Sequence, residues 1–230
     1  MLKPPALTRT PPLMDQAFAK LRRNVLSGHH PAGVKLKIEE LQSAYGISSS
    51  PLREALSRLA QEGLIRADER RGFRVPPISS EDLADITRMR LMLDVPALRD
   101  AIAVGDDAWE GTIVAAFHRL ELVEERLGSG PVSLDDNWSE LHRAFHFALL
   151  SACPSERQLT WSESLFDQAE RYRRYSAEHR RTARSKNSEH KRLLDATLSR
   201  DAATACALLE EHILSTQRNV EAAITARRGS

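Results

Sequence analysis

The sequence predicts a mainly α-helical protein, with an N-terminal winged helix-turn-helix followed by a C-terminal, all-α antiparallel helical bundle. Three observations lead to this fold class. Apolar residues recur at helical spacing through most of the 230 residues. Ala, Leu, Arg and Glu, which favour helices, are abundant, whereas aromatic residues make up 5% of the chain. A hairpin pattern lies between residues 64 and 75, directly after three short helical segments.

Composition divides the chain into a tail and two domains. Residues 1–12 are rich in proline and hold no long apolar run, so we expect a flexible tail and neither a signal peptide nor a membrane span. Pro76 and Pro77 mark a stiff linker. We therefore expect a winged helix-turn-helix over residues 13–77 and an all-helical domain over residues 78–226.

Glycines and prolines delimit the N-terminal elements. Gly28 and Pro31 end the first helix, Gly46 ends the second, and Gly63 ends the third. Three serines followed by Pro51 favour the start of the third helix. The expected elements are helices at 13–26, 38–45 and 51–62 and strands at 64–66 and 73–75.

The C-terminal domain has helical patterning throughout, and nothing after Ser79 alternates like a strand. The helical pattern is interrupted at Gly105, over the segment 128–131 and at Pro154. Such an array predicts an antiparallel bundle. The expected helices run from 80 to about 104, from there to about 127, from about 133 to 152, and, as two or three further helices, over about 155–226 with breaks near 180–186 and at 200–201.

The charge distribution is uneven. Residues 1–78 hold 13 Lys and Arg against 7 Asp and Glu, a net +6, whereas residues 79–230 hold 20 against 25, a net −5. A basic half joined to an acidic half suggests a polyanion-binding module attached to another function; the alternative is chance surface charge. The two cysteines, Cys153 and Cys206, form no disulfide framework, which favours a reducing cytoplasm.

The order helix, short helix, turn, helix and hairpin is typical of a winged helix-turn-helix that binds double-stranded operator DNA. The third helix begins with small hydroxyl residues, so its N-terminus can approach a major groove and its N–H groups favour phosphate. Arg53 in its first turn can reach a guanine edge or a phosphate; the alternative is a surface ion pair with Glu54 or Glu62. The candidate DNA contacts are Ser48, Ser49, Ser50, Arg53, Arg58, Arg70, Arg71 and Gly72.

These motifs resemble the GntR family of bacterial regulators. The resemblance covers about residues 13–77 and implies that the third helix and the wing contact the operator. Members commonly have arginine where this chain has Ser49, and often another basic residue near Glu39, so Arg53 is left as the best candidate contact. The residues that carry the resemblance are Leu41, Gly46-Ile47-Ser48, Pro51-Leu52-Arg53-Glu54-Ala55-Leu56, Leu59, Glu62-Gly63-Leu64 and Arg71-Gly72-Phe73-Arg74-Val75.

Four of the eight histidines have spacing that suits a metal site. His142 and His146 are four residues apart, so they share one helical face and can hold a transition metal together. His190 and His212 follow acidic residues and border apolar ones, so both can point inward from later helices. The alternative is chance, because eight histidines in 230 residues often give such a pair.

Residues 80–222 resemble the FCD effector domain of the FadR branch of this family, and most closely its CsiR-type members, which are associated with glutarate and related acids. Many such domains bind a divalent metal through one aspartate and three histidines. The resemblance implies that residues 78–226 bind an effector and dimerise. The motifs are Arg90-Leu91-Met92-Leu93-Asp94, Leu141-His142-Arg143-Ala144-Phe145-His146, Glu189-His190-Lys191-Arg192-Leu193-Leu194-Asp195-Ala196, Asp201 and Glu211-His212.

The resemblance also implies the ligands of the site. His142 stands where the aspartate is usual, so the metal ligands would be four histidines, which favour zinc or nickel over calcium or magnesium. In this family the cavity beside the metal receives a small carboxylate. Arg90 is a candidate effector ligand, the alternative being an exposed i,i+4 pair with Asp94. Tyr172 is a second candidate, the alternative being core packing.

Three functions follow from these features. The first is a homodimeric repressor whose affinity for a palindromic operator is controlled by a small carboxylate, such as the dicarboxylate glutarate. The second is a regulator that senses the metal ion itself. The third is a metal-dependent hydrolase. It is disfavoured because four histidines leave little room at a tetrahedral metal, although an octahedral metal would keep positions open, and because the winged helix would be unexplained. We therefore expect a regulator and not an enzyme.

Overall fold

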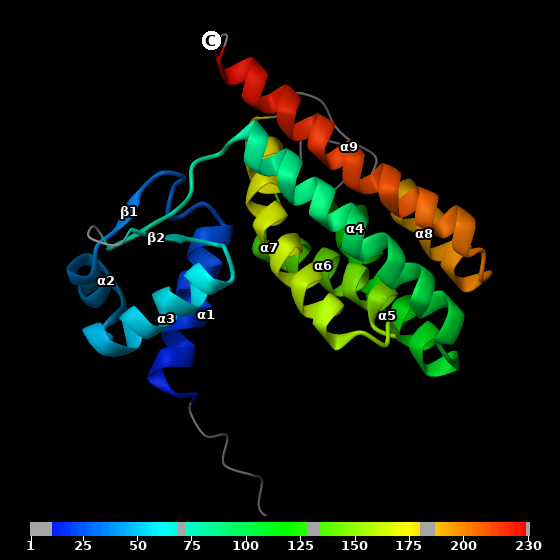
Figure 1. The fold of residues 1–230 in the computed structure, drawn as a ribbon, viewed down its shortest axis with the longest axis horizontal. Helices are drawn as coiled ribbons and strands as arrows, with labels where there is room; N and C mark the ends of the chain where they lie inside the picture. Colours follow the sequence, from blue (N-terminus) through cyan, green and yellow to red (C-terminus); the bar gives the residue numbers. More distant parts are fainter. Residues whose placement is uncertain (1–10, 69–71, 128–133, 180–186, 229–230) are drawn as a thin grey trace, which may run out of the picture. The chain divides into compact units, whose positions relative to one another are not determined.

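The computed structural model describes residues 11–68, 72–127, 134–179 and 187–228. The chain forms two compact units (Figure 1). One consists of residues up to 76 except 26–28, and the other consists of residues 26–28 and everything from 77 onward. Within the described residues, no helix is both long enough and apolar enough to cross a membrane.

The first unit is a winged helix-turn-helix, as the sequence predicts. Its helices are α1 (Leu13–Leu26), α2 (Ile38–Tyr45) and α3 (Ser49–Gln61), and its strands are β1 (Lys35–Leu36), β2 (Arg66–Asp68) and β3 (Gly72–Arg74). The strands pair antiparallel in the order β1-β3-β2.

Several details of this unit differ from the prediction: α3 was expected at 51–62 and β3 at 73–75, so each begins one or two residues earlier than expected. Leu64 and Ile65 were expected in the first strand, but both are fully buried in the turn before it, so β2 starts two residues later. The sheet also has a strand, β1, that the sequence did not indicate. It is two residues long and exists because Leu36 pairs with Phe73, far along the chain.

A shared apolar core fixes the position of α3. This helix buries Leu52, Ala55, Leu56 and Leu59 on one face, and α1 contributes Ala17, Leu21 and Val25 to the same core. Gly46 ends α2 in the left-handed conformation at φ 68°, which glycine adopts without strain. Helix α3 begins two residues before Pro51, whose missing N–H is tolerated because first-turn N–H groups have no partner within the helix.

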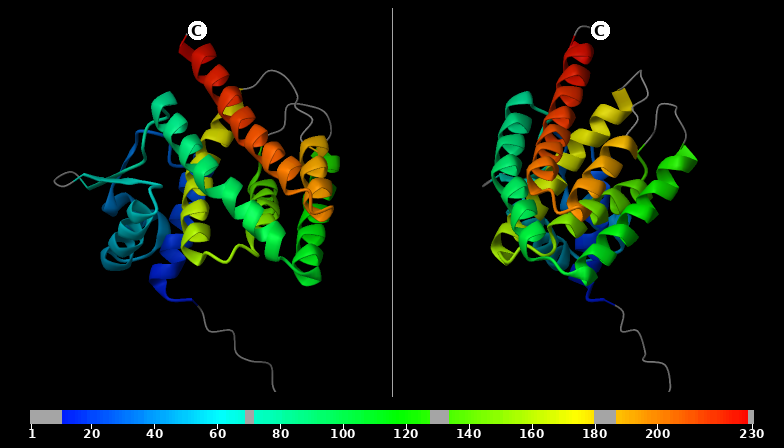
Figure 2. Two further views of the ribbon diagram at one scale, coloured as in Figure 1. Left: turned by 45° about the vertical axis from the view of Figure 1, so that its right-hand side comes forward. Right: turned by 90° about the vertical axis from the view of Figure 1, so that its right-hand side faces the viewer.

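The second unit is entirely helical in its described part. Its helices are α4 (Ser80–Val104), α5 (Asp107–Leu127), α6 (Asp136–Leu150), α7 (Glu156–His179), α8 (Asn187–Leu198) and α9 (Ala202–Arg228). Helix α4 packs against both α7 and α9, and both views in Figure 2 show α4 and α9 side by side. The predicted breaks are close to the observed ones; α6 starts at Asp136 because Asp135 caps it by accepting a 2.7 Å hydrogen bond from the Trp138 N–H.

Two apolar clusters hold this unit together. The larger one joins α4, α5, α6, α8 and α9 and contains Leu98, Ile113, Phe145 and Leu209 among its fully buried members. The smaller one joins the first turns of α4 to the later turns of α7 and α9 and includes Leu83, Ile86, Ala169, Tyr172, Val220 and Ile224. The polar residues described next lie on the helices that these clusters pack together.

Candidate functional site

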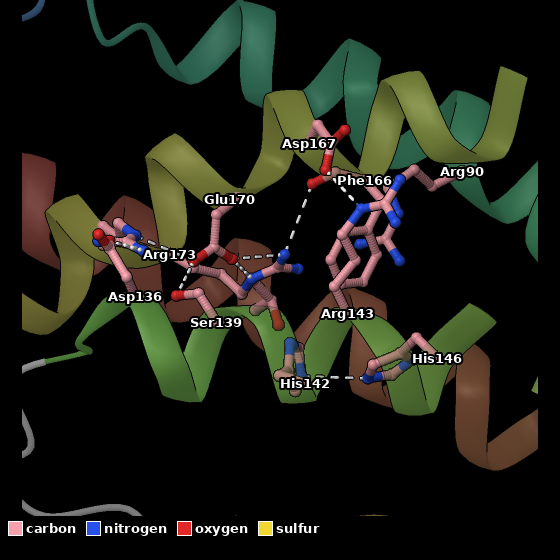
Figure 3. Close-up of polar contacts among 12 residues, drawn as sticks. Arg90, Asp136, Ser139, His142, Arg143, His146, Phe166, Asp167, Glu170 and Arg173 are labelled. Atoms are coloured by element: carbon pink, nitrogen blue, oxygen red, sulfur yellow. Dashed lines mark hydrogen bonds and ion pairs between the residues drawn. The ribbon is translucent and has the colours of Figure 1, made fainter. Parts of the chain in front are cut away.

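Two histidines one turn apart on α6 form the centre of the site. His142 and His146 are 1% and 4% exposed, and their Nε2 atoms lie 3.1 Å apart (Figure 3). Burial lowers the pKa of both imidazoles well below the usual value, and the neighbouring histidines lower it further. Both rings are therefore neutral near pH 7, which is the form that binds metal ions.

Helices α8 and α9 bring the other two histidines to the same place. One ligand atom from each of His142, His146, His190 and His212 lies within 4.8 Å of the others. His190 is fully buried, and the side chain of His212 is 10% exposed. The four residues singled out by sequence spacing thus form one cluster.

The cluster meets the requirements of a transition-metal ion. Nδ1 of His142 and both ring nitrogens of His190 are buried and have no hydrogen-bond partner among the described residues. Buried polar atoms without a partner are rare in folded proteins. Two imidazole nitrogens bound to one zinc ion at about 2.0–2.1 Å would stand roughly 3.3 Å apart in a tetrahedral site, close to the spacing of His142 and His146. An all-imidazole donor set suits zinc or nickel.

Carboxylates and an indole ring surround the histidines. Nδ1 of His212 lies 3.2 Å from Oε2 of Glu189, and Nδ1 of His190 lies 3.4 Å from Oε1 of Glu124. Trp138 stacks on His142 with ring centroids 4.4 Å apart and donates a 3.2 Å hydrogen bond to Glu124. Sequence reasoning missed Glu124 and Trp138, because no local pattern indicates which helix faces meet.

A pocket opens beside His146. It is small, and among its lining residues are Arg90, Asp94, His146 and Phe166. Arg90 and Asp94 form a 2.9 Å ion pair, as the i,i+4 alternative expected, but the pair is buried at about 4% exposure and not exposed. Burial raises the pKa of Asp94, even though Arg90 opposes the shift.

A second buried arginine, Arg173 on α7, approaches the same aromatic ring. Its guanidinium carbon lies 4.1 Å from the centre of Phe166, and that of Arg90 lies 5.0 Å from it (Figure 3). Arg173 pairs at 2.7 Å with Glu170, which also accepts a hydrogen bond from the Ser139 hydroxyl. Both arginines lower the pKa of His146, and Arg173 also lowers the pKa of His142. No local pattern in the sequence singles out Arg173.

Tyr172 lies in a different place from the one its candidate role requires. Its ring is fully buried in the smaller apolar cluster, and its hydroxyl donates a 2.6 Å hydrogen bond to Asp82 on α4. Tyr172 does not line the pocket beside His146. This placement matches the core-packing alternative, with an added link between α7 and the start of α4.

The predicted DNA contacts on α3 have different surroundings. Ser48, Ser50 and Arg53 are exposed and Ser49 is half-buried, and Arg53 makes no ion pair with any residue that the structure describes. Arg58 instead lies over the Phe18 ring at 4.0 Å and 3.5 Å from Glu62.

On the wing, the described contact candidate is Gly72, which begins β3 with a positive φ of 87°. Arg70 and Arg71 lie outside the described residues.

Known families match both units. Residues 13–75 match the family described as "Bacterial regulatory proteins, gntR family", and residues 85–215 match the family described as "FCD domain". The second match alone covers more than half of the chain.

Two relatives match over most of their length. The chain is 41% identical over 203 residues to "Uncharacterized HTH-type transcriptional regulator BphR" of Paraburkholderia xenovorans (strain LB400), covering 88% of this chain and 83% of the relative. It is 35% identical over 201 residues to "HTH-type transcriptional repressor GlaR" of Escherichia coli (strain K12), covering 85% and 90%.

Solved structures share the fold. E. coli McbR/YncC superimposes with a TM-score of 0.75 at 20% identity, over 95% of this chain and all of that one. A putative transcriptional regulator GntR from Rhodococcus sp. RHA1 gives a TM-score of 0.70 at 18% identity, over 91% and 97%.

Proposed function

This chain belongs to the GntR family of bacterial regulatory proteins and carries an FCD domain, and from that premise we propose that it is a repressor whose affinity for operator DNA is controlled by a small carboxylate bound beside a metal ion. Family membership makes it a DNA-binding transcriptional regulator and not an enzyme. Repression, the metal and the acid are the parts proposed here.

Binding to DNA depends on α3. Its exposed N-terminal end carries Ser48, Ser50 and the unpaired guanidinium of Arg53. An arginine near the start of such a helix can bind a guanine edge through two hydrogen bonds, and the nearby backbone N–H groups favour phosphate. We propose a homodimer on a palindromic operator, since two recognition helices related by a two-fold axis would meet two half-sites. Repression is supported by the repressor that matches 85% of this chain.

The metal would be held by His142, His146, His190 and His212, and zinc or nickel suits them. When bound, the metal supplies a Lewis-acidic site for an oxygen of the effector. His142 and His146 are buried, neutral imidazoles, so no proton has to be displaced from them near pH 7.

One observation carries the effector proposal: His146 and Arg90 line the same pocket. A carboxylate there would meet a metal-bound histidine on one side and a guanidinium on the other. Arginine binds carboxylates through two parallel hydrogen bonds. Arg173, whose guanidinium carbon lies 4.1 Å from the centre of the pocket-lining Phe166 ring, supplies a second positive group nearby, which supports a dicarboxylate such as glutarate as the first acid to try.

Helix α4 connects this pocket to the linker. It carries Arg90 and Asp94 in its middle, and its first residue, Ser80, comes three residues after Pro77. An acid that pairs with Arg90 competes with Asp94 for the guanidinium. We propose that the resulting shift of α4 changes the spacing of the two recognition helices, and so their match to the operator.

The test uses the purified full-length protein, stripped with a chelator and then reloaded with Zn²⁺ or Ni²⁺. Thermal melting is recorded with and without glutarate and with acetate as a monocarboxylate. We expect the metal to raise the melting temperature, and an acid to raise it further only in the loaded protein. His146→Ala should lose both shifts, Arg90→Ala should lose the acid shift alone, and His118→Ala, an exposed histidine on α5, should lose neither.

A second part of the experiment measures the affinity of the protein for DNA. Duplexes that bind are selected from a random pool, and their affinity is then followed by fluorescence anisotropy. An acid that weakens binding by 5-fold or more supports the proposal, since couplings of about 1–3 kcal/mol are usual. If removing the metal alone switches DNA binding and no acid has an effect, the protein senses the metal ion. If neither metal nor acid alters melting or DNA binding, the proposal is wrong.

A further inference from the structure

Glu124 on α5 is a buried carboxylate without a cation. Its side chain is 8% exposed, and its Oε2 atom is buried with no hydrogen-bond partner among the described residues. Its Oε1 atom receives one hydrogen bond, from the indole N–H of Trp138. No lysine or arginine of the described chain lies within ion-pair distance of it. Burying a carboxylate in this way is costly unless a positive charge offsets it.

Other buried carboxylates in the same unit are neutralised by arginine. Asp94 pairs with Arg90 at 2.9 Å, and Glu170 pairs with Arg173 at 2.7 Å. Asp167 pairs with Arg143 at 3.0 Å. Glu124 differs from these three carboxylates in having no arginine partner among the described residues.

One of the four histidines lies within ion-pair distance of Glu124. Nδ1 of His190 lies 3.4 Å from Oε1 of Glu124, on the side of the ring that is available to a carboxylate when the other nitrogen binds a metal. Glu124 itself is not among the residues whose ligand atoms converge, so it would act through His190 and not as a ligand. The bound metal ion would supply the positive charge that balances the carboxylate of Glu124.

Trp138 joins Glu124 to a second histidine. Its N–H group donates to Glu124, while its ring stacks on His142 with an interplanar angle of 17°. Glu124 and Trp138 together therefore touch two of the four histidines, one from α6 and one from α8. Such an arrangement fixes both the position of the carboxylate and the planes of the rings.

From these contacts we propose that Glu124 is the positioning residue and counter-charge of the metal site. It orients His190 from the Nδ1 side of the ring, 3.4 Å away, and it offsets the charge of a divalent ion that imidazole ligands leave uncompensated. This inference rests on the proposed metal site. Glu189 does the same for His212, but its side chain is 34% exposed, so water competes with it and its effect is smaller.

The experiment measures metal affinity by competition with a chromophoric chelator, on full-length protein first stripped of metal. We expect Glu124→Gln to weaken Zn²⁺ binding about 10- to 100-fold, the range found for such partners of metal-bound histidines. Glu189→Gln should weaken it by a smaller factor. Glu125→Gln, an exposed neighbour on the same helix, should leave it unchanged.

A spectroscopic readout separates positioning from a general loss of structure. Co²⁺ absorption bands report the geometry of the ligands, so Glu124→Gln should change their position or intensity while the melting temperature of the metal-free protein stays close to that of the unmodified chain. Trp138→Phe, which removes the N–H donor but keeps a ring over His142, should weaken Zn²⁺ binding in the same direction.

The outcomes distinguish this inference from the metal site on which it rests. Unchanged Zn²⁺ affinity and unchanged Co²⁺ bands in Glu124→Gln would overturn the role of Glu124 and leave the metal site intact. If the metal-free Glu124→Gln protein fails to fold, Trp138→Phe is measured in its place. An unchanged Zn²⁺ affinity of Trp138→Phe would count equally against the proposal. Failure of the unmodified protein to bind Zn²⁺, Ni²⁺ or Co²⁺ would overturn the proposed metal site itself.

Discussion

The hydroxyl of Tyr172 donates a 2.6 Å hydrogen bond to Asp82, which lies 90 residues earlier in the chain. Tyr172 stands on α7, one residue before the buried Arg173, and Asp82 stands in the first turn of α4. Burial raises the pKa of Tyr172, and the carboxylate of Asp82 raises it further, so the hydroxyl keeps its proton. The bond therefore ties the helix that carries one side of the pocket to the start of the helix that follows the linker.

Removing this hydroxyl should weaken that connection. We expect Tyr172→Phe to lower the free energy of unfolding by about 1 kcal/mol, the usual worth of one hydrogen bond, and to leave Zn²⁺ affinity unchanged. Urea unfolding measures the first and chelator competition the second. Tyr175→Phe is the matched control, because Tyr175 lies in the same cluster but its hydroxyl makes no hydrogen bond to the described chain. Equal losses in both variants would show that packing alone matters.

The sequence predicts the helices well because their signals are local. Apolar spacing and the stops at Gly46 and Gly105 place α1, α2 and α4 to the residue. Strand β1 could not be predicted, because two residues carry no alternation and its partner Phe73 is distant in sequence. The shifted β2 has the same cause: Leu64 and Ile65 look like strand residues, but they are buried by the helices.

The site could be predicted only in part, for a related reason. The four histidines have a spacing and acidic neighbours that suggest an inward face on each helix. The partners of these histidines, Glu124 and Trp138, and the second arginine, Arg173, depend on which helix faces meet in three dimensions. Tyr172 was a candidate effector ligand because it lies between arginines in the sequence. In the structure it packs instead in the smaller apolar cluster.

Arg53 and Arg58 on α3 should behave differently. We expect Arg53→Ala to weaken binding to the selected duplex by about 1–3 kcal/mol, or roughly 5- to 150-fold, because its exposed guanidinium is free to contact DNA. Arg58→Ala should mainly lower thermal stability, by about 0.5–1 kcal/mol, since its guanidinium lies over Phe18. Anisotropy and thermal melting of both variants check this. A loss of DNA affinity in Arg58→Ala without any loss of stability would show that Arg58 also contacts DNA.

Glu170 should make the stability of the protein depend on pH. Its burial raises the pKa, but Arg173 and the hydrogen bonds that Glu170 accepts outweigh burial and hold the pKa below the ordinary value of 4.5. A carboxyl whose pKa is lowered by folding stabilises the fold above its unfolded pKa, and this contribution is lost as the pH falls through the folded value.

We therefore expect the unfolding free energy to fall below about pH 4.5 more steeply in the unmodified protein than in Glu170→Gln. Urea unfolding between pH 3 and 7 measures both slopes. Glu140→Gln, an exposed residue on α6, serves as control and should retain the slope of the unmodified protein. Parallel curves for Glu170→Gln and the unmodified protein would contradict the stabilising role of the carboxylate.

Two glycines in neighbouring helices should respond to alanine in opposite ways. A Cβ atom at Gly105, the residue that ends α4, would lie 2.2 Å from the ring of Trp109, which is held in place by a 2.9 Å hydrogen bond to the Ala148 carbonyl. The indole cannot move without losing that bond, so we expect Gly105→Ala to destabilise the protein by about 1–3 kcal/mol, as other overpacked sites do. Gly111, inside α5, has open space around it, so Gly111→Ala should stabilise by about 0.5–1 kcal/mol through its better helix propensity. Urea unfolding of the two variants measures both signs, and a neutral Gly105→Ala would mean that the ring of Trp109 is free to shift.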